Sequence, residues 1–588
     1  MRVVLRSAVL SVLIFIGCFS QAENFSGQLF TNGKIITVNQ NFDIVEALAI
    51  RGGKFLAVGS NKQVLEAAGS NAEIIDLKGR TVIPGFIDGH AHMDREGLKF
   101  ILPSLQGVHS IEDILAVVRQ EVKNKKPGEW IVTMPIGDYP DFNKKPSQLK
   151  EKRYPTRWDL DRVAPNNPVY IKGRWFYWSF DSPIVSIANS YALKLAGISN
   201  ETQAPYPALK ILKNSLGVPN GIFEEPGPLT AIEYSLMKVA PRFSHQDRVD
   251  ALIYSMQQYN TVGTTSVYEG HGVAPPVIQA YKELHEQGKL TVRSHLVMSP
   301  AWDTVAKVKP LTIMRNWASY LSGKGTGDEL LRISGIYTAV GNSRVDDIRR
   351  KDSNYPNWSG FSVDVLLPKD RASLFDLLSA SAKTNIRAHA ITYLEKDIDQ
   401  HLQVLEKVHQ ETPIDKKRFV MEHVSFVSEQ NQHKIKKLGV IPTVIPGPMI
   451  WKSGLRQTRN LEPVKANTYV PLKSFVDKGI PFVIGTDNMP YNPLHALWAS
   501  VTRVDATTGK VSSPEQRISR KEALKALTIN AAYLSYEEDI KGSIEVGKLA
   551  DMAILSKDYL TVPDEEIRHI EVLMTLLGGQ VVFKSENY

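Results

Sequence analysis

Residues 81–92 read Thr-Val-Ile-Pro-Gly-Phe-Ile-Asp-Gly-His-Ala-His, an apolar run that ends in two histidines one residue apart. Side chains alternate between the two faces of a β-strand, so His90 and His92 are expected on the same face of a strand end. Two neutral imidazoles on one face can bind one divalent metal ion. A histidine pair alone is weak evidence, but the preceding apolar run, with its Pro and Gly, predicts a buried strand. A buried strand that ends in metal ligands is typical of an α/β barrel.

Short apolar runs alternate with longer helical segments over most of the chain, which is the pattern of repeated βα units. Further barrel strands are predicted at residues 264–268, 291–297, 332–339, 386–389, 418–423, 441–445 and 482–485. Three of these apolar runs lead into His389, His423 and Asp487. Because the carboxyl ends of barrel strands converge on one mouth, these side chains are expected to meet the histidine pair.

Both ends of the chain carry short alternating runs separated by Gly, Asn and Asp, a pattern that predicts β-strands. We expect residues 23–83 and 540–588 to pair in one β-sandwich domain. This domain would flank a TIM-type (β/α)8 barrel formed by residues 84–539, so the predicted fold class is α/β. Residues from about 94 to 260 interrupt the barrel pattern and are predicted to form a large insertion over the barrel mouth.

Residues 1–22 have the pattern of a secretory signal peptide. Arg2 and Arg6 precede an apolar stretch, and small residues suited to cleavage end the segment at Ala22. The apolar stretch is shorter than the roughly 20 residues that span a bilayer. We therefore expect export to the periplasm or beyond. The alternative is lipidation of Cys18, which is the one reading that predicts membrane attachment.

The composition is that of an ordinary globular protein, with 588 residues, 43% hydrophobic and 22% charged. Cys18 is the only cysteine, so cleavage after the leader excludes disulfides, thiolate ligands and a cysteine nucleophile. Metal ligands must then be His, Asp or Glu. The formal charge of +8 is spread without long basic blocks, so no nucleic-acid partner is predicted. The expected partner is a small-molecule substrate, and no feature indicates an oligomeric state.

Several motifs resemble the metal-dependent amidohydrolase superfamily, and within it the amidohydrolase-3 group that includes YtcJ-like proteins and N-substituted formamide deformylases. The resemblance covers nearly all of the chain after the leader. The motifs that carry it are residues 84–92, 159–169, 189–198, Met421-Glu-His423, Gly485-Thr-Asp487 and 547–551.

This resemblance implies that His90 and His92 bind a metal ion from the first strand. It implies that His389 and His423 come from the fifth and sixth strands, and that Asp487 from the eighth is both a ligand and the proton shuttle. A bound divalent ion, expected to be zinc, lowers the pKa of a water molecule, and a neighbouring carboxylate can move its proton to a leaving nitrogen. The implied activity is hydrolysis of a carbon–nitrogen bond in an amide, N-formyl or N-acyl group.

The chain departs from the family pattern on the fourth strand. Tyr337 stands where family members often carry a carboxylated lysine that bridges two metals. One ion held by His90, His92, His389 and Asp487 is therefore expected, with His423 as a ligand or as a group that orients water and substrate. Glu269 is a candidate ligand, whereas His271 lies between two glycines that predict a flexible turn.

A second departure follows His389, where Tyr393 replaces the Asp of the family pattern and puts the usual hydrogen-bond network around the ligands in doubt. Deaminase-like members often carry a Glu three residues after this His, and Thr392 at that position argues against nucleobase deamination. Candidate substrate contacts outside the ligand set are Glu224 with Glu225, the aromatic run 174–178 and Arg503. The alternatives for them are a solvated loop, packing of the insertion and an exposed helix face.

Two other functions remain open from the sequence. The same site can hydrolyse a cyclic amide, an imide or a lactone, because attack on each carbonyl needs the same residues. A non-catalytic exported protein that binds a metal or ligand is the other alternative, and Tyr337 and Tyr393 motivate it. The joint presence of His389, His423 and Asp487 argues against loss of catalysis.

Overall fold

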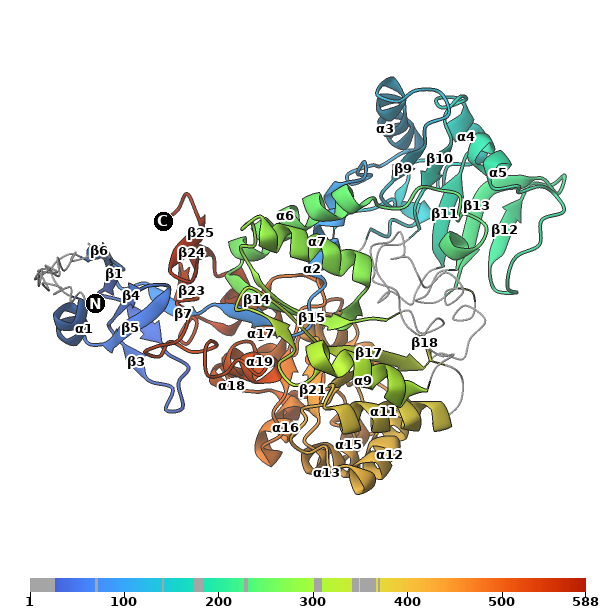
Figure 1. The fold of residues 1–588 in the computed structure, drawn as a ribbon. Coiled ribbons are helices and arrows are strands. Elements are labelled where there is room, and N and C mark those ends of the chain that lie inside the picture. The colour runs from blue at the N-terminus through green and yellow to red at the C-terminus, as the bar shows by residue number, and fades with distance from the viewer. Residues whose placement is uncertain are drawn as a thin grey trace, which may run out of the picture.

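The computed structural model describes residues 27–588 except 69–71, 140–141, 174–182, 227–230, 301–308, 341–347, 349–365 and 368–370. The predicted leader with Cys18 and the aromatic run 174–178 lie outside these residues. Figure 1 shows the sheets of the two chain ends on the left, a central barrel and an inserted sheet at the upper right.

Eight parallel strands form the centre of the molecule. In spatial order they are β8 (Phe86–Asp88), β14 (Thr264–Val273), β15 (Arg293–Met298), β17 (Leu331–Val340), β19 (Ala388–Ile391), β20 (Val420–Glu422), β21 (Ile441–Val444) and β22 (Val483–Ile484). Each neighbouring pair is parallel. The Gly89 amide donates to the Ile484 carbonyl at 3.1 Å and connects the first strand to the last. All the predicted strand ranges overlap an observed strand, and the barrel is nearly closed.

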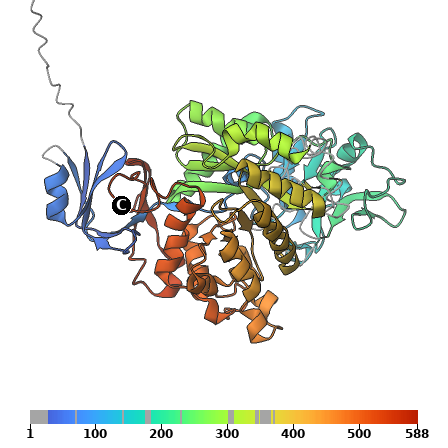
Figure 2. The ribbon, with the colours of Figure 1, turned by 60° about the horizontal axis from the view of Figure 1, so that its bottom comes forward.

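Helices alternate with these strands and lie outside them, as the two ribbon views show (Figures 1 and 2). The main ones are α6 (His245–Thr261), α7 (Pro275–Glu286), α9 (Pro310–Leu321), α11 (Arg371–Thr384), α12 (Glu395–Glu411), α13 (Glu429–Leu438), α16 (Leu472–Lys478), α17 (Pro493–Thr502), α18 (Arg520–Ala526) and α19 (Ile529–Leu534). Helices cover the outside of the parallel sheet and side chains fill its inside, which explains why β21 is buried along its whole length.

The apolar run that opens the motif at 81–92 is divided between two sheets. Its first half is β7 (Thr81–Pro84), which pairs with β23 (Met552–Leu555) from the far end of the chain. Its second half is β8 in the barrel, and Gly85 stands between them. A side chain at Gly85 would lie 2.2 Å from the Thr265 hydroxyl oxygen, so the crossing point has room for glycine alone.

The two chain ends therefore share one sheet, in the order β25 (Gln580–Lys584), β24 (Val572–Leu577), β23, β7, β2 (Lys34–Ile36) and β3 (Ile44–Val45). A second sheet has the order β5 (Lys54–Gly59), β4 (Ala47–Arg51), β1 (Gln28–Thr31) and β6 (Glu73–Asp76). Phe30 and Leu48 from the second sheet belong to the same buried apolar cluster as Ile554 from the first.

A separate sheet occupies the long segment between β8 and β14. Its order is β12 (Lys210–Lys213), β13 (Pro219–Glu225), β11 (Ile184–Ala188), β10 (Val169–Ile171) and β9 (Ile131–Thr133), with α3 (Ile111–Lys123), α4 (Arg157–Asp161) and α5 (Ser190–Leu195) beside it. It has apolar clusters of its own, and Figure 1 places it to one side of the barrel.

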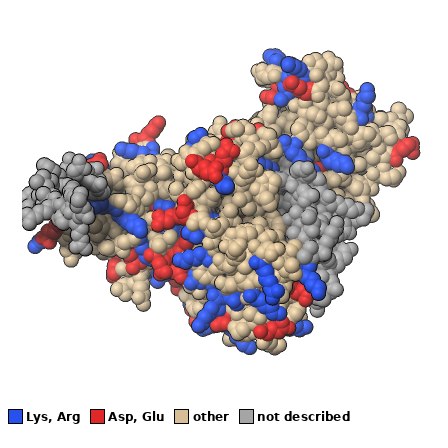
Figure 3. Space-filling model, viewed as in Figure 1, with Lys and Arg blue, Asp and Glu red and all other residues tan. Residues whose placement is uncertain are grey.

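The described residues include no helix with the length and apolar character needed to cross a membrane. On the face drawn in Figure 3, basic and acidic side chains are interspersed over the barrel and the inserted sheet.

Candidate metal centre

Asp88, at the end of β8, fixes the backbone from which both motif histidines project. Its fully buried carboxylate accepts bonds from the Thr486 hydroxyl at 2.5 Å and the Thr486 amide at 2.9 Å. The same carboxylate accepts the His90 amide at 3.2 Å. Burial raises the pKa of Asp88 to about 7, against the hydrogen bonds that lower it. The first strand and the segment after the last strand are thus held together directly beneath the histidines.

The residues after β22 bind the same backbone from the other side. The Asp487 amide donates to the His90 carbonyl at 2.9 Å, and the Asn488 side chain donates to the His92 carbonyl at 2.7 Å. Asp487 and His423 have φ angles of +52° and +59°, which place them in the left-handed region that residues other than Gly rarely adopt. Such backbone positions persist where the surrounding structure holds them, and they concentrate at functional sites.

Four predicted ligands converge above the barrel. The Nε2 atoms of His90 and His423 are 2.9 Å apart. Asp487 Oδ1 lies 2.9 Å from His92 Nε2 and 3.9 Å from His90 Nε2. All four side chains are at least nine-tenths buried. The ends of strands one, six and eight therefore bring His90, His92, His423 and Asp487 close together, and their role as metal ligands stays a prediction.

This donor set fits a divalent ion of the zinc type. Two imidazole nitrogens facing each other at 2.9 Å repel unless a proton or a cation lies between them. Nitrogen ligands of a tetrahedral zinc ion, each at about 2.0 to 2.1 Å from it, are about 3.3 Å apart. Burial lowers the pKa of His90 well below its usual range, and the charge of His423 acts in the same direction. A neutral imidazole is the form that binds a metal.

His271 is a further residue at this site, and the expected flexible turn is wrong. β14 continues through residue 273, so His271 lies on a strand. Its ligand atoms lie within 4.8 Å of those of His90 and His92. A shift in register after Glu269 and the small residues Gly270 and Gly272 distort this end of the strand, which is why the sequence resembles a turn. In the sequence, only the strand predicted at residues 264–268 indicated that a strand leads towards His271.

Glu269 lies beside the cluster and also binds groups outside it. Its Oε1 accepts the Met93 amide at 2.7 Å and the Tyr281 hydroxyl at 2.9 Å. These bonds hold the start of α2 (Met93–Glu96), and burial raises the pKa of Glu269 well above its usual range. The ligand atoms of Glu269, His92 and Asp94 also lie within 4.8 Å of one another. A ligand role for Glu269 stays a prediction beside its role as an anchor for α2.

His389 is a predicted ligand that the structure places outside the cluster formed by His90, His423 and Asp487. Its Nε2 lies 2.6 Å from the Tyr268 hydroxyl, and its Nδ1 lies 3.3 Å from the Ile336 carbonyl oxygen. Over the described ranges, none of the three clusters of possible metal ligands includes His389. Tyr337, at the position of the family lysine, is buried with its ring centre 5.1 Å from that of His271. The role of His389 as a ligand stays a prediction.

The proposed contact of Arg503 with substrate is wrong. Arg503 is fully buried, and its guanidinium donates to the carbonyls of Ser512, Val470 and Tyr469 at 2.8, 3.0 and 3.1 Å. Glu225 is not on a solvated loop either. It lies buried on β13 and accepts the Ala231 amide at 2.7 Å. Both residues stabilise their own segments.

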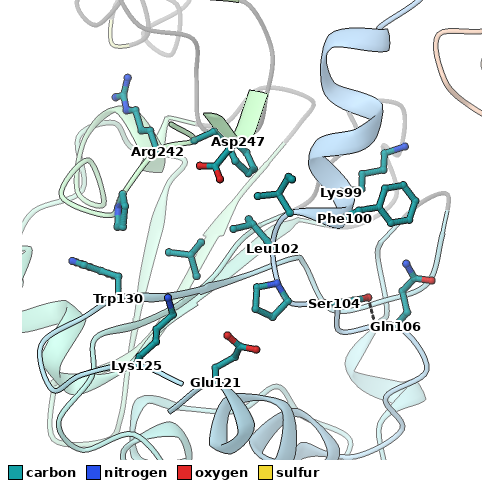
Figure 4. Close-up of a pocket in the computed structure, with 15 residues that line it drawn as sticks. Lys99, Phe100, Leu102, Ser104, Gln106, Glu121, Lys125, Trp130, Arg242 and Asp247 are labelled. Atoms are coloured by element: carbon teal, nitrogen blue, oxygen red, sulfur yellow. Dashed lines mark hydrogen bonds between the residues drawn. The ribbon is translucent and has the colours of Figure 1, made fainter. Parts of the chain in front are cut away.

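The cavity in Figure 4 lies apart from the metal cluster. It has a volume of about 700 Å³ and lies within the inserted segment, between residues 99–106, the end of α3 and the start of α6. Its lining includes Lys99, Phe100, Lys125, Trp130, Arg242 and Asp247. None of the candidate metal ligands lines it.

A parallel α/β barrel with a buried His and Asp cluster beyond the carboxyl ends of its strands defines a metal-dependent hydrolase. The chain belongs to the amidohydrolase family, whose model matches residues 73–583.

Similar proteins extend over nearly the same length. The N-substituted formamide deformylase of Arthrobacter pascens is 26% identical over 564 residues, which cover 94% of this chain and 97% of the relative. YtcJ of Bacillus subtilis is 23% identical and covers 95% and 99% of the two chains. An uncharacterized metal-dependent hydrolase from Pyrococcus furiosus has the same fold, with a TM-score of 0.67 at 23% identity over 91% of this chain and 100% of the other.

Proposed function

We propose that this protein is an exported zinc hydrolase that cleaves the carbon–nitrogen bond of a small amide, N-formyl or N-acyl compound. The observation that carries the proposal is the convergence of His90, His423 and Asp487, whose ligand atoms lie within 4.8 Å of one another in a buried site. The full-length similarity to a formamide deformylase supports the choice of bond. The signal-peptide pattern predicted for residues 1–22 supports export.

The residues of the site have separable tasks. His90, His92, His423 and Asp487 would hold the ion, which would supply a Lewis acid and lower the pKa of a water molecule towards neutrality. The carboxylate of Asp487 takes a proton from the attacking water and returns it to the leaving nitrogen. The Arg95 guanidinium, 3.7 Å from Asp487 Oδ1, orients that carboxylate. No covalent bond to the protein is needed.

We further propose a single ion. At the position of the family lysine, Tyr337 packs against His271, and a phenol ring supplies no carboxylate bridge between two metals. We also propose that the two sheets of the chain ends assemble as one β-sandwich, because they share one buried apolar cluster.

Metal analysis and substrate assays test the proposal together. We expect about one equivalent of zinc, turnover of N-formyl or N-acyl amides, and a loss of at least about 100-fold in kcat for Asp487→Asn. Asp505→Asn is the matched control, because Asp505 is a buried carboxylate that binds the backbone of its own loop. Cyclic amides and lactones assayed in parallel decide the ring preference. Less than one tenth equivalent of metal in the folded protein, or full activity of Asp487→Asn, refutes the proposal.

A further inference from the structure

Glu422 ends β20 and lies beneath the metal cluster. It is fully buried, and its Oε2 lies 3.4 Å from His90 Nδ1. Within the described parts of the chain, neither oxygen of this carboxylate has a hydrogen-bond partner. Burying a carboxylate without partners costs several kcal/mol, so a sequence under no other constraint would place an apolar residue here.

Gly270 provides the space that this carboxylate occupies. A Cβ atom at position 270 would lie 2.3 Å from Glu422 Oε1, closer than any real contact. The backbone of Gly270 is outside the left-handed region, so its conformation suits other residues equally well. The requirement at position 270 is therefore space, and the group that needs it is Glu422.

The imidazole of His90 faces two different environments. Its Nε2 faces His423 Nε2 at 2.9 Å, on the side of the candidate ligands. Its Nδ1 has no hydrogen-bond partner in the described structure and has Glu422 as its neighbouring carboxylate. A neutral imidazole carries one proton, and the hydrogen bond made by one nitrogen decides which nitrogen is free to bind a metal.

We propose that Glu422 is a positioning residue for the metal centre. Its carboxylate accepts the Nδ1 proton of His90, so the Nε2 lone pair points at the ion, and Gly270 makes room for that carboxylate. A carboxylate behind a ligating histidine raises the basicity of the ligand and fixes its orientation. The inference rests on the proposed metal site and adds a residue that does not itself touch the ion.

Zinc affinity, measured with Zn²⁺ alone by competition with a chelator, tests this role without any substrate. We expect Glu422→Ala to raise the Kd for zinc by about 10- to 100-fold, the usual effect of losing such a partner. Glu422→Gln keeps the shape and an acceptor oxygen, so its loss should be smaller. Glu225→Gln removes a buried carboxylate from β13 and should leave the Kd unchanged.

A double-mutant cycle separates positioning from simple packing. Gly270→Ala leaves every ligand in place but displaces the carboxylate, so it should raise the zinc Kd by about 10-fold in the natural background. In the Glu422→Ala background the added methyl group has space, and the further change should be less than about twofold. Circular dichroism of each variant checks the fold.

Two results overturn the inference while leaving the proposed function intact. One is a wild-type zinc Kd in all the Glu422 and Gly270 variants, and the other is an equal cost of Gly270→Ala in both backgrounds. A natural protein that folds but binds no zinc refutes the proposed function itself, and the role of Glu422 with it.

Discussion

Two bonds from Thr486 to Asp88 connect the last strand to the first beside the metal cluster, and replacing Thr486 by Val removes the hydroxyl bond with little change of shape while the amide bond stays. The Thr486 hydroxyl donates to Asp88 Oδ2 at 2.5 Å and accepts the Asn488 amide at 3.2 Å. Both Thr486 and Asp88 are at most 1% exposed, so water cannot replace either bond.

The expected loss of stability follows from the two groups that lose the Thr486 hydroxyl as a partner, namely Asp88 Oδ2 and the Asn488 amide. A hydrogen bond to a charged group contributes about 1.5 to 3 kcal/mol, and an unpaired buried amide costs about 1 to 3 kcal/mol. Thr486→Val should therefore lower the free energy of unfolding by about 3 to 5 kcal/mol. The assay is urea unfolding of the metal-free protein at pH 8, above the pKa of about 7 of Asp88, so that its carboxylate is ionised.

Thr443→Val is the matched control, because Thr443 lies on the neighbouring strand β21 and is also fully buried. Its hydroxyl has no hydrogen-bond partner among the described residues, so its removal relieves an unsatisfied polar group. We expect this variant to be unchanged or more stable by about 1 kcal/mol. The reasoning is refuted if Thr486→Val costs less than about 1 kcal/mol, or if the two variants lose the same amount.

Other expectations follow from the same structure. Burial lowers the pKa of His401 in the folded protein to about 4, below its usual value of 6.5. The buried neutral imidazole therefore costs no stability above pH 6.5, and the folded state loses stability as the pH falls from 6.5 towards 4. His401→Leu should therefore gain about 2 to 3 kcal/mol over the natural protein between pH 7.5 and 4.5 in unfolding titrations, and parallel curves would contradict this. Arg503→Met should cost about 3 kcal/mol or more of stability through its three carbonyl bonds and leave KM unchanged for anionic substrates; a raised KM without destabilisation would restore a substrate role. Chelation should lower the melting temperature of the natural protein, and added Zn²⁺ should restore it, whereas a His90→Asn, His92→Asn double variant should show no shift.

Much of the barrel was predictable because each strand is a short apolar run between polar segments. His90, His92, His423 and Asp487 were predictable for the same reason, since each follows such a run directly. In a barrel, position along a strand decides which side chains reach the mouth. The local sequence therefore contained enough information to place these four side chains together.

The remaining features depend on contacts between strands that no local pattern records. Tyr268 reaches His389 across the barrel, and Gly270 leaves space for the carboxylate of Glu422. Arg503 binds carbonyls that come from segments more than thirty residues away, as well as one nearby. The glycines around His271 indicated a turn, whereas the pairing of Val273 with Met298 beyond them keeps the segment on the strand. Long-range packing decided each of these positions against the local signal.

The split of the apolar run at Gly85 has a consequence for the order in which the molecule is made. β7 precedes the metal-binding histidines by a few residues, but its antiparallel partner β23 ends at Leu555, close to the carboxyl terminus. A chain still on the ribosome, or one truncated before that strand, leaves one edge of β7 without its partner. The histidines are thus synthesised early, whereas β23, which pairs with the strand before them, is synthesised late. Contacts of such long sequence separation form slowly.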